Sequence, residues 1–591
     1  MDKPNSSTLK WLIQTTGKKK IYILFLILLQ AVLAIAGVFS ALLFRRLIDS
    51  AVARNSPLFF QAALWIGALI LGRIALNALG YFLYEWTSST LENQFKERLF
   101  SCLLRKSYAS VTAIHSEEWM NRLTSDTSVV TGGLIEIIPG LTGMLTRLVG
   151  ALAAIFFLEP VFAAILIPGG IVILLFTYGF RRILKRLHKQ IRETDGIVRV
   201  FLQERLSSLM IVRAFAMEKE TQEMAAEKMR RHKAARMRRN HLSNLCNTGF
   251  GAAANGLYLF GAVYCGYGIL QGSISYGTMT AVLQLIGQVQ SPFAGLTGII
   301  PQYYAMAASA ERLMEAEGYA EDCGGEAVPE QEILRYYQED FQSIGLAHAG
   351  FRYLEAQGQE SRQDQDQGQD SGTAPGMRPA VLNDVDLEIG KGEYVAFTGH
   401  SGCGKSTILK LLMCLYPLDS GRAYLAGKGG SQPLTARWRG LFAYVPQGNQ
   451  LMSGTIREIV AFGDQKGMQE EQKMMQALKI ACADEFVASL EEGLDTRLGE
   501  RGSGLSEGQM QRIAIARAVF SEHPILMLDE STSALDEGTE RELLGNLRAM
   551  TDMTVLIVTH RPAVLKICDK QVVMGADGQV NVCKEICYTG R

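Results

Sequence analysis

The sequence lacks the regular cysteine spacing that disulfide scaffolds and zinc sites require. Its ten cysteines include no CxxC pair, so we expect reduced thiols in a cytoplasmic domain. The chain also lacks an excess of either charge, because 59 basic and 59 acidic residues give a formal net charge of zero. This balance argues against bulk nucleic-acid binding, and no nucleic-acid partner is expected.

What the chain has is length and apolar content. Its 591 residues exceed what one core accommodates, and 48% of them are hydrophobic. Residues 1–300 contain long apolar runs separated by basic segments, whereas the later part mixes strand, helix and turn signals. We therefore expect a multi-domain protein with an all-α transmembrane domain over residues 1–315, a linker over 316–340 and an α/β domain over 341–591.

Six stretches reach the length of about 20 apolar residues that a helix needs to cross a bilayer. They are residues 21–44, 58–83, 134–158, 161–180, 247–270 and 278–300. Gly and other small residues replace much of the Leu and Ile in the last two, which is typical of membrane helices packed against neighbours. The first run is too long to be the apolar core of a cleaved signal peptide.

Basic residues predict how the chain is oriented in the membrane. Lys18, Lys19 and Lys20 precede the first span, and residues 181–239 are crowded with Lys and Arg. Cytoplasmic loops carry such an excess of basic residues, so both segments are expected on the cytoplasmic side. Six spans then leave both termini in the cytoplasm. We expect the lipid bilayer to be a bacterial plasma membrane.

Polar side chains inside the expected spans are candidates for a substrate cavity. Arg73 and Arg147 are the clearest, because ionisable residues at membrane depth are commonly functional. Snorkelling or an inter-helix pair explains them equally well. Asn255, Gln284 and Gln288 either line a polar cavity or make hydrogen bonds between helices. The sequence alone leaves both alternatives open.

A biased segment interrupts the second half of the chain at residues 355–377. It is rich in Gln, Asp and Gly, and it offers very little apolar surface to bury. Such a composition predicts a disordered surface loop. Its acidic and amide groups could also attract a cation, but the segment contains no His and no spaced set of ligands. A tolerated insertion is the favoured interpretation.

A glycine-rich run matches the phosphate-loop pattern G-x-x-x-x-G-K-[ST]. Its residues are Gly399, His400, Ser401, Gly402, Cys403, Gly404, Lys405, Ser406 and Thr407. A strand-like segment precedes the run and a helix-like segment follows it, as the motif requires. Backbone amides and the helix N-terminus would bind phosphate, Lys405 would add a cation, and the Ser406 hydroxyl would ligate Mg²⁺. The sequence therefore predicts an ATP site.

Two further elements accompany the phosphate loop. The continuous apolar run 525–528 is typical of a buried parallel strand and ends in two acids. Asp529 is expected to hold Mg²⁺, directly or through water, and Glu530 to act as the general base. Ser506 and Gln509 form a capping box that presents a second helix N-terminus. Taken alone, a solvated acidic pair and a simple helix cap are ordinary alternatives.

Together these elements resemble an ABC transporter, specifically an exporter-type half-transporter, over nearly the whole chain. The resemblance includes the Walker A loop, the signature LSEGQ at 505–509, the Walker B strand ending at Asp529, the D-loop SALD at 533–536, and His560. Residues 121–126 resemble the first intracellular loop, and residues 204–218 the second. In the family these loops carry short coupling helices.

The resemblance implies a role for each matched residue. Tyr353 would stack on adenine, Gln447 would reach Mg²⁺, and His560 would steady the γ-phosphate. Ser506 and Gly508 of one copy would contact the nucleotide held by Lys405 of another. The remaining positions that the resemblance assigns to the nucleotide are Gln509 and Asp536. Glu507 departs from the usual glycine of the signature, and we expect its carboxylate to point away from the phosphate.

The expected function is ATP-hydrolysing export of a small molecule, lipid or peptide from the cytoplasm by alternating access. ATP and Mg²⁺ are the expected cofactors. The alternatives are import on the same scaffold, or ATP gating of a channel or of a regulated partner. Because no motif is degenerate, a second copy of the chain is the favoured partner, and a related half-transporter is less favoured. The transported substrate cannot be derived from the sequence.

Overall fold

A computed structural model describes most of the chain. The described residues are 6–322, 324–353, 380–448, 451–462, 464–499, 502, 504–550, 552–575 and 578–583. The chain divides into two compact units. We call residues 1–100 with 120–317 the helical unit, and residues 101–119 with 318–591 the sheet unit. The expected insert, 355–377, lies outside the described residues.

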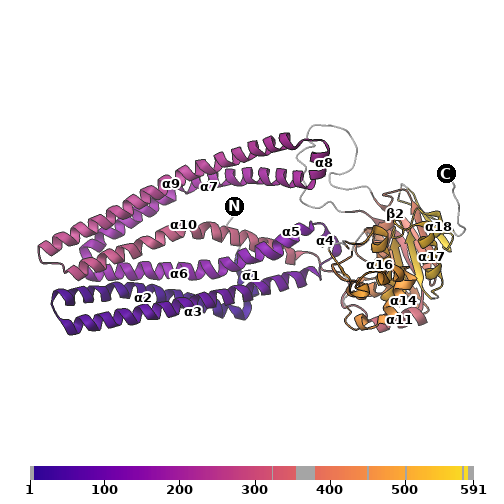
Figure 1. The fold of residues 1–591 in the computed structure, drawn as a ribbon, viewed down its shortest axis with the longest axis horizontal. Helices are drawn as coiled ribbons and strands as arrows, with labels where there is room; N and C mark the ends of the chain where they lie inside the picture. The colour runs from indigo at the N-terminus through magenta and orange to yellow at the C-terminus, as the bar shows by residue number, and fades with distance from the viewer. Residues whose placement is uncertain are drawn as a thin grey trace. The chain divides into compact units, whose positions relative to one another are not determined.

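The helical unit is built from long helices joined by short turns (Figure 1). They are α1 (Ser6–Thr16), α2 (Lys20–Val52), α3 (Ser56–Leu103), α6 (Thr127–Leu158), α7 (Pro160–Ser207), α8 (Leu209–Ala214), α9 (Glu218–Leu270) and α10 (Tyr276–Gly318). The short helix α5 (Ser116–Asn121) begins in the sheet unit and ends in the helical unit. A π-helical turn, Arg122–Asp126, joins α5 to α6. Pro160 starts α7 because a proline at the first helical position sacrifices no hydrogen bond. The short helix α8 links the ends of α7 and α9.

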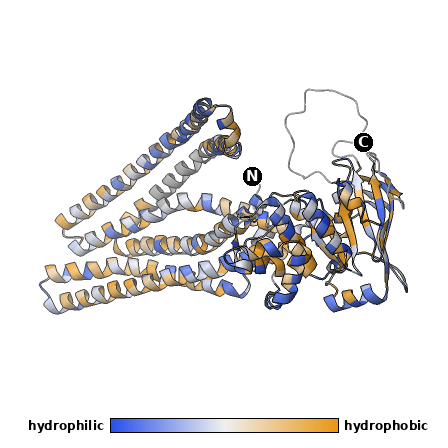
Figure 2. Ribbon diagram, turned by 45° about the vertical axis from the view of Figure 1, so that its right-hand side comes forward, coloured by the Kyte–Doolittle hydropathy of each residue, from blue (hydrophilic) through white to orange (hydrophobic). Residues whose placement is uncertain are grey.

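The helical unit contains helices that meet the length and composition of membrane spans. Among the described residues these are Lys10–Val52, Ser56–Leu103, Ser116–Leu158 and Glu218–Leu270. They contain the first, second, third and fifth expected spans, while the count of six stays a prediction. Hydrophobic residues follow much of the length of these helices, and the ends of α7 and α9 beside α8 are mostly hydrophilic (Figure 2). This distribution fits helices that leave the membrane and continue into water.

A core of small and branched apolar residues holds α2, α6, α7, α9 and α10 together. Ala41, Ile155, Phe162 and Ile286 are fully buried in it. The position of Gly261 in α9 has no room for a larger side chain, because a Cβ there would lie 2.7 Å from Ile286. Small residues at such positions let membrane helices approach closely.

The sheet unit is an α/β domain built on two main sheets. Its strands are β1 (Phe341–Phe351), β2 (Leu382–Gly390), β3 (Tyr394–Gly399), β4 (Ser420–Gly427), β5 (Gly430–Pro433), β6 (Phe442–Val445), β7 (Gly454–Thr455), β8 (Arg497–Leu498), β9 (Ile525–Asp529), β10 (Thr554–Val558), β11 (Lys570–Met574) and β12 (Val580–Cys583). The central sheet has the order β12-β11-β3-β10-β9-β6 and is parallel except for β12. An antiparallel sheet has the order β2-β1-β4-β5.

Helices of the sheet unit connect and cover these strands. They are α4 (Tyr108–Thr112), α11 (Glu330–Glu339), α12 (Lys405–Leu412), α13 (Ile456–Ala461), α14 (Glu471–Ile480), α15 (Asp484–Ala488), α16 (Glu507–Phe520), α17 (Glu537–Arg548) and α18 (Pro562–Leu565). A helical domain followed by an α/β domain is the fold class predicted from the sequence, and it is confirmed.

Alternate residues of the central strands face two different cores. Phe397 and Met527 pack with Leu409 of α12 and with the antiparallel sheet. Leu528, the next residue along β9, packs instead with Ile513 of α16 on the other face of the sheet. Because strand side chains alternate between faces, α12 and α16 cover opposite sides of the same sheet.

Candidate nucleotide-binding site

Four neighbouring parallel strands end beside one another in the central sheet. The phosphate loop follows β3, His560 follows β10, Asp529 and Glu530 end β9, and Gln447 follows β6. Ligands of open α/β sheets bind outside the carboxyl ends of such strands. The structure therefore brings the phosphate loop, the acids of the Walker B strand, Gln447 and His560 to one edge of the sheet.

The phosphate loop has a backbone that requires glycine. Gly399 has φ of 146° and Gly404 has φ of 101°, both in the region that other residues rarely adopt. A Cβ on Gly399 would also lie 2.7 Å from the carbonyl oxygen of Met574. The loop leads directly into α12, whose first residue is Lys405. Backbone amides at this helix N-terminus are available for an anion.

Lys405 is a buried cation that has no anionic partner in the part of the chain that the structure describes. Its side chain donates to the carbonyl oxygens of Gly399 and His400 at 3.0 and 2.9 Å, and the residue is only 5% exposed. No carboxylate of the described residues forms an ion pair with it. A buried charge that lacks a counter-charge is costly. The phosphate groups of a nucleotide would supply this counter-charge.

Asp529 is held by two hydroxyl groups. Ser406 donates to its Oδ1 at 2.8 Å, and Tyr444 donates to its Oδ2 at 3.1 Å. Burial raises the pKa of the Asp529 carboxyl above its usual value, although both hydrogen bonds act in the opposite direction. The adjacent carboxylate and hydroxyl oxygens are the ligand types that Mg²⁺ prefers. Tyr444, which sequence reasoning missed, lies three residues before Gln447 in the segment YVPQ.

Glu530 lies between the two residues expected to act with it. Gln447 donates to Oε2 at 2.7 Å, and His560 Nε2 lies 3.6 Å from Oε1. Glu530 has φ of 50°, which is strained for a residue with a side chain, and such strain is concentrated at functional sites. The side chain is only partly buried, so a water molecule could reach its free lone pairs. This geometry suits a general base.

The aromatic residue predicted to bind adenine belongs to a larger cluster. The Tyr353 ring meets the edges of Phe351 and Tyr416, with centroids 4.9 and 5.3 Å away. Its hydroxyl lies 3.0 Å from the Thr407 hydroxyl of the phosphate loop. Tyr416 in turn contacts Tyr108 of α4 at 5.6 Å. Tyr416 and Tyr108 were not identified from the sequence, because isolated aromatic residues carry no motif.

The signature segment begins α16, and its capping box is confirmed. Ser506 accepts from the Gln509 amide at 3.3 Å, while Gln509 accepts from the Ser506 amide at 2.9 Å. Gly508 has no room for a side chain, since a Cβ would lie 2.9 Å from the Ala534 carbonyl oxygen. Glu507 is exposed at the start of the helix. No interaction recorded among the described residues joins this segment to the phosphate loop.

The D-loop is fixed by residues on both sides of it. Asp536 caps α17 by accepting from the amides of Gly538 and Thr539 at 3.1 and 3.0 Å. These hydrogen bonds, that of Thr539 first, lower the pKa of the exposed Asp536 carboxyl. Arg561 donates to the carbonyl oxygens of Ser533 and Leu535 at 2.7 and 2.9 Å. Arg561 follows His560 directly, a position that the sequence analysis passed over.

Polar residues singled out in the expected spans make neutral contacts. Arg147 donates to the Ser291 hydroxyl at 3.3 Å, and Gln288 donates to the Gly37 carbonyl oxygen at 2.8 Å. Gln288 thus makes one of the predicted hydrogen bonds between helices. Asn255 instead donates to Gly251 in its own helix at 2.9 Å. Arg73 is exposed, and its role stays a prediction.

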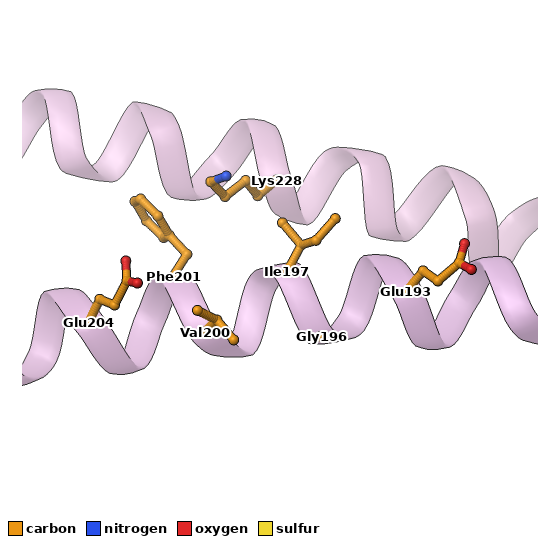
Figure 3. Close-up of a pocket in the computed structure, with 7 residues that line it drawn as sticks. All are labelled: Glu193, Gly196, Ile197, Val200, Phe201, Glu204 and Lys228. Atoms are coloured by element: carbon orange, nitrogen blue, oxygen red, sulfur yellow. The ribbon is translucent and has the colours of Figure 1, made fainter. Parts of the chain in front are cut away.

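An open cavity of about 450 Å³ lies between α7 and α9 of the helical unit (Figure 3). Ile197 and Phe201 project from α7 toward α9, and the Lys228 ammonium lies 5.2 Å from the centre of the Phe201 ring. Two carboxylates, Glu193 and Glu204, flank this apolar floor. The cavity contains no element of the predicted ATP chemistry.

Two family models match the chain. Residues 23–293 match the ABC transporter transmembrane region, and residues 382–533 match the ABC transporter domain. The ATP-dependent lipid A-core flippase of Chromobacterium violaceum is 27% identical over 572 residues, covering 93% of this chain and 90% of the flippase. The leukotoxin translocation ATP-binding protein LktB of a Pasteurella haemolytica-like species is 27% identical, covering 95% of this chain and 76% of LktB.

The fold has a counterpart among solved structures. A bacterial Atm1-family ABC exporter with ATP bound superimposes with a TM-score of 0.74 at 21% identity, covering 96% of this chain and 94% of the exporter. This likeness concerns the fold. The two matched regions together span well over half of the chain, which therefore belongs to the ABC transporters, as a half-transporter with the exporter-type architecture. It is a multi-pass membrane protein that binds nucleotide and couples ATP hydrolysis to transport.

Proposed function

We propose that two copies of this chain clasp two ATP molecules between their sheet units and thereby export an amphiphilic substrate from the cytoplasm. The observation that carries this proposal is the placement of α12 and α16 on opposite faces of one sheet. The phosphate loop and the signature of one copy are thus separated by the sheet itself. A second copy, facing head to tail, would bring its Ser506 and Gly508 to the nucleotide held by Lys405.

The nucleotide fits the residues of the site. The Lys405 ammonium, which donates to two carbonyl oxygens, and the amides that begin α12 would bind the phosphates. Tyr353 would stack on the base, and its packing against Phe351 and Tyr416 would hold the ring in place. The buried thiol of Cys403 lies beside Gly399 and packs within the phosphate loop. His400, Ser401 and Gly402 form the exposed part of the loop that faces the nucleotide.

Mg²⁺ fits the oxygen atoms gathered at the end of β9. Ser406, Asp529 and Gln447 would hold it, and a bound Mg²⁺ would neutralise charge on the phosphate oxygens. No cluster of three or more His, Cys, Asp or Glu side chains that could hold a metal ion occurs among the described residues. Mg²⁺ tolerates so sparse a protein site because it retains waters and substrate phosphates as ligands. The Ser406 hydroxyl now donates to Asp529, and this bond would give way to metal ligation.

Glu530 would accept the proton of the attacking water. Gln447 fixes one of its carboxylate oxygens, which leaves the other side directed toward His560. His560 would then steady the phosphate that receives the water. Asp536 would keep the D-loop rigid at the dimer interface through its cap of α17. These roles need no movement of β9, because the carboxylates lie at the fixed end of a buried strand.

The helical unit offers a surface suited to a second copy. The helix α8 and the residue that follows it expose large apolar side chains, Met210 at 81% and Phe215 at 75%. Exposed apolar clusters of this kind mark interaction sites. Their place between the hydrophilic ends of α7 and α9 fits the coupling role that the family resemblance gives to the second intracellular loop.

The direction and substrate class rest on the relatives. One is named as a lipid A-core flippase and the other as a leukotoxin translocation protein, so lipid or peptide export is favoured over import. The basic segments before the first span and along α7 and α9 support cytoplasmic termini, and the homodimer and the bacterial plasma membrane are further parts of the proposal. Gating of a channel without pumping is the less favoured function.

Mixed dimers test the head-to-tail arrangement. One copy carries Lys405→Ala and the other carries Ser506→Ala, both in a Glu530→Gln background that retains ATP. In a head-to-tail dimer one site then has both defects and the other has none. We expect one occluded ATP per mixed dimer, measured with radiolabelled nucleotide after rapid gel filtration, and almost none in either matched dimer.

If each site lay within one copy, every site in the mixed dimer would carry a defect. Equal loss of ATP in the mixed and matched dimers would therefore contradict the proposal. The Glu530→Gln dimer without further changes serves as the control and should occlude two ATP molecules.

A further inference from the structure

Three helices of the helical unit meet at one carboxylate. Tyr84 of α3 donates its hydroxyl to Glu136 Oε1 at 2.7 Å, and Gln302 of α10 donates its side-chain amide to Oε2 at 3.2 Å. The three residues are far apart in the sequence, so only the packing of α3, α6 and α10 brings them together. We call these three residues the Glu136 cluster.

Close packing between α6 and α10 fixes the position of this cluster. Gly133 lies against Met306, where a Cβ would come within 2.5 Å of the sulfur. Further along the same pair of helices, Gly295 lies against Met144. The contact between Glu136 and Gln302 follows the same antiparallel register. The carboxylate is therefore held by the seam between two helices and does not depend on a flexible loop.

The carboxylate is accessible, and its partners within the described part of the chain are neutral. Glu136 is exposed in the single chain, and its recorded hydrogen bonds come only from the neutral donors Tyr84 and Gln302. No Lys, Arg or His of the described residues forms an ion pair with it. One turn to either side, Gly132 and Gly140 have no neighbouring atom within 4 Å of where a Cβ would be. Space is thus open around the carboxylate.

The sequence around Glu136 makes this exposure unusual. Leu134, Ile135, Ile137 and Ile138 surround it, at the start of the third expected span. An ionisable group in such a segment belongs against the bundle interior or a water-filled cavity, because lipid would not solvate it. Two neutral donors orient a carboxylate without cancelling its charge. A positively charged group of a ligand would complement this carboxylate.

We propose that the Glu136 cluster is a substrate subsite for the cationic group of an amphiphilic molecule, such as a substituted ammonium or phosphonium. The inference rests on the proposed export function and names one chemical feature of its substrate. Glu136 supplies the charge, and Tyr84 and Gln302 orient the carboxylate toward the open side of α6. Ile138, which is 43% exposed, contacts the apolar part of the same molecule, while Leu134, Ile135 and Ile137 are buried and hold α6 in place.

Two lipophilic ions of matched size and opposite charge provide the test. The full chain is placed in phosphatidylcholine nanodiscs, and the Kd values of tetraphenylphosphonium and tetraphenylborate are measured after subtraction of empty nanodiscs. We expect Glu136→Gln to weaken binding of the phosphonium at least about tenfold, the range for loss of one member of a desolvated charge pair. Binding of the borate should not weaken. Glu97→Gln on α3, an exposed carboxylate outside the cluster, should change neither Kd.

A second variant keeps the carboxylate in place. Gln302→Lys gives Glu136 an ammonium partner within the chain, and it should lower phosphonium affinity as Glu136→Gln does. An unchanged phosphonium Kd in both variants would overturn the proposal. Equal weakening of both ions would also overturn it, because that result indicates a purely structural hydrogen-bond lock. ATP turnover of the unmodified chain in the same nanodiscs is measured separately, and its absence would count against the proposed export function alone.

Discussion

The strands of the central sheet are covered on both faces, whereas the long helices of the helical unit expose large apolar side chains. Ile525 to Leu528 are completely buried between two layers of the sheet unit. In the helical unit Leu64 is 74% exposed and Phe157 is 84% exposed. The sheet unit thus forms its own core, while the helical unit needs lipid or another copy of the chain to cover its surface.

The two units also differ in the partners of their charged side chains. In the sheet unit Asp529 and Glu530 have partners at the same edge of the central sheet, and two of these partners, Ser406 and Gln447, belong to short sequence motifs. In the helical unit the hydrogen-bond partners of Glu136 and Arg147 among the described residues are neutral and come from distant parts of the sequence. Several residues of the nucleotide site are therefore recognisable from short sequence motifs. The Glu136 cluster is instead formed by the packing of helices, and it stays accessible to a ligand.

The largest expected effect concerns the nucleotide site of the sheet unit. Glu530→Gln removes the proposed base but keeps a hydrogen-bonding group of the same size for Gln447. ATP hydrolysis should fall by at least about 100-fold, while ATP binding is retained. Steady-state turnover and nucleotide binding in reconstituted protein measure the two properties separately.

The matched control is Glu537→Gln, the same exchange at an exposed position in the first turn of α17. It should leave turnover within about twofold, since surface substitutions have small effects. Near-normal turnover in Glu530→Gln would remove Glu530 from the role of base.

A second prediction concerns Asp126, a carboxylate of the helical unit that has a charged partner in Arg312. Asp126 is buried and accepts hydrogen bonds from Ser309 and Arg312 at 2.9 and 2.7 Å. Asp126→Ala would leave the Arg312 guanidinium without its carboxylate, at a cost of about 3 kcal/mol. The low end of the usual range applies because Arg312 is partly exposed. Thermal unfolding in detergent should show a clearly lower Tm.

The comparison variant for Asp126 is Asp195→Ala, which breaks an exposed ion pair with Arg199 on α7. Exposed pairs contribute about 0–1 kcal/mol, so its Tm should be close to that of the unmodified chain. Equal Tm losses in both variants would show that burial does not govern this network.

The smallest expected effect tests the close packing of the sheet unit. Gly508→Ala would place a Cβ 2.9 Å from the Ala534 carbonyl oxygen, so the start of α16 must move. We expect a loss of about 1–3 kcal/mol in stability, typical of overpacking. Gly545→Ala on α17 meets no atom within 4 Å and should instead gain about 0.4–1 kcal/mol. Tm values of the two variants should move in opposite directions, and a shared direction would contradict this account.

Local patterns predicted much of the sheet unit. The phosphate loop lies between β3 and α12, and the capping box of Ser506 and Gln509 begins α16, as their residues indicated. Such features depend on neighbours within a few positions, so short motifs are sufficient. Tyr444, Tyr416 and Arg561 were missed because their partners lie on other strands and helices. Nothing in their own sequence neighbourhood distinguishes them from ordinary core residues.

Apolar runs likewise predicted long membrane helices, but the partners of polar groups inside them were not predictable. A run of about 20 apolar residues indicates a span without indicating its rotation. Gln288 turned out to contact α2, while Asn255 contacts its own helix. The rotation of each helix follows from close contacts such as Gly133 with Met306, which join residues distant in sequence.

The sequence by itself determined the chemistry of this protein: a phosphate loop, a Walker B strand, a signature and a set of apolar runs, each recognisable because its physical requirement is local. Only the tertiary structure decided that α12 and α16 cover opposite faces of a sheet, and that Tyr84, Glu136 and Gln302 meet. Both facts depend on which faces of strands and helices are buried together. That choice is made by packing across the whole unit, and no single segment contains it.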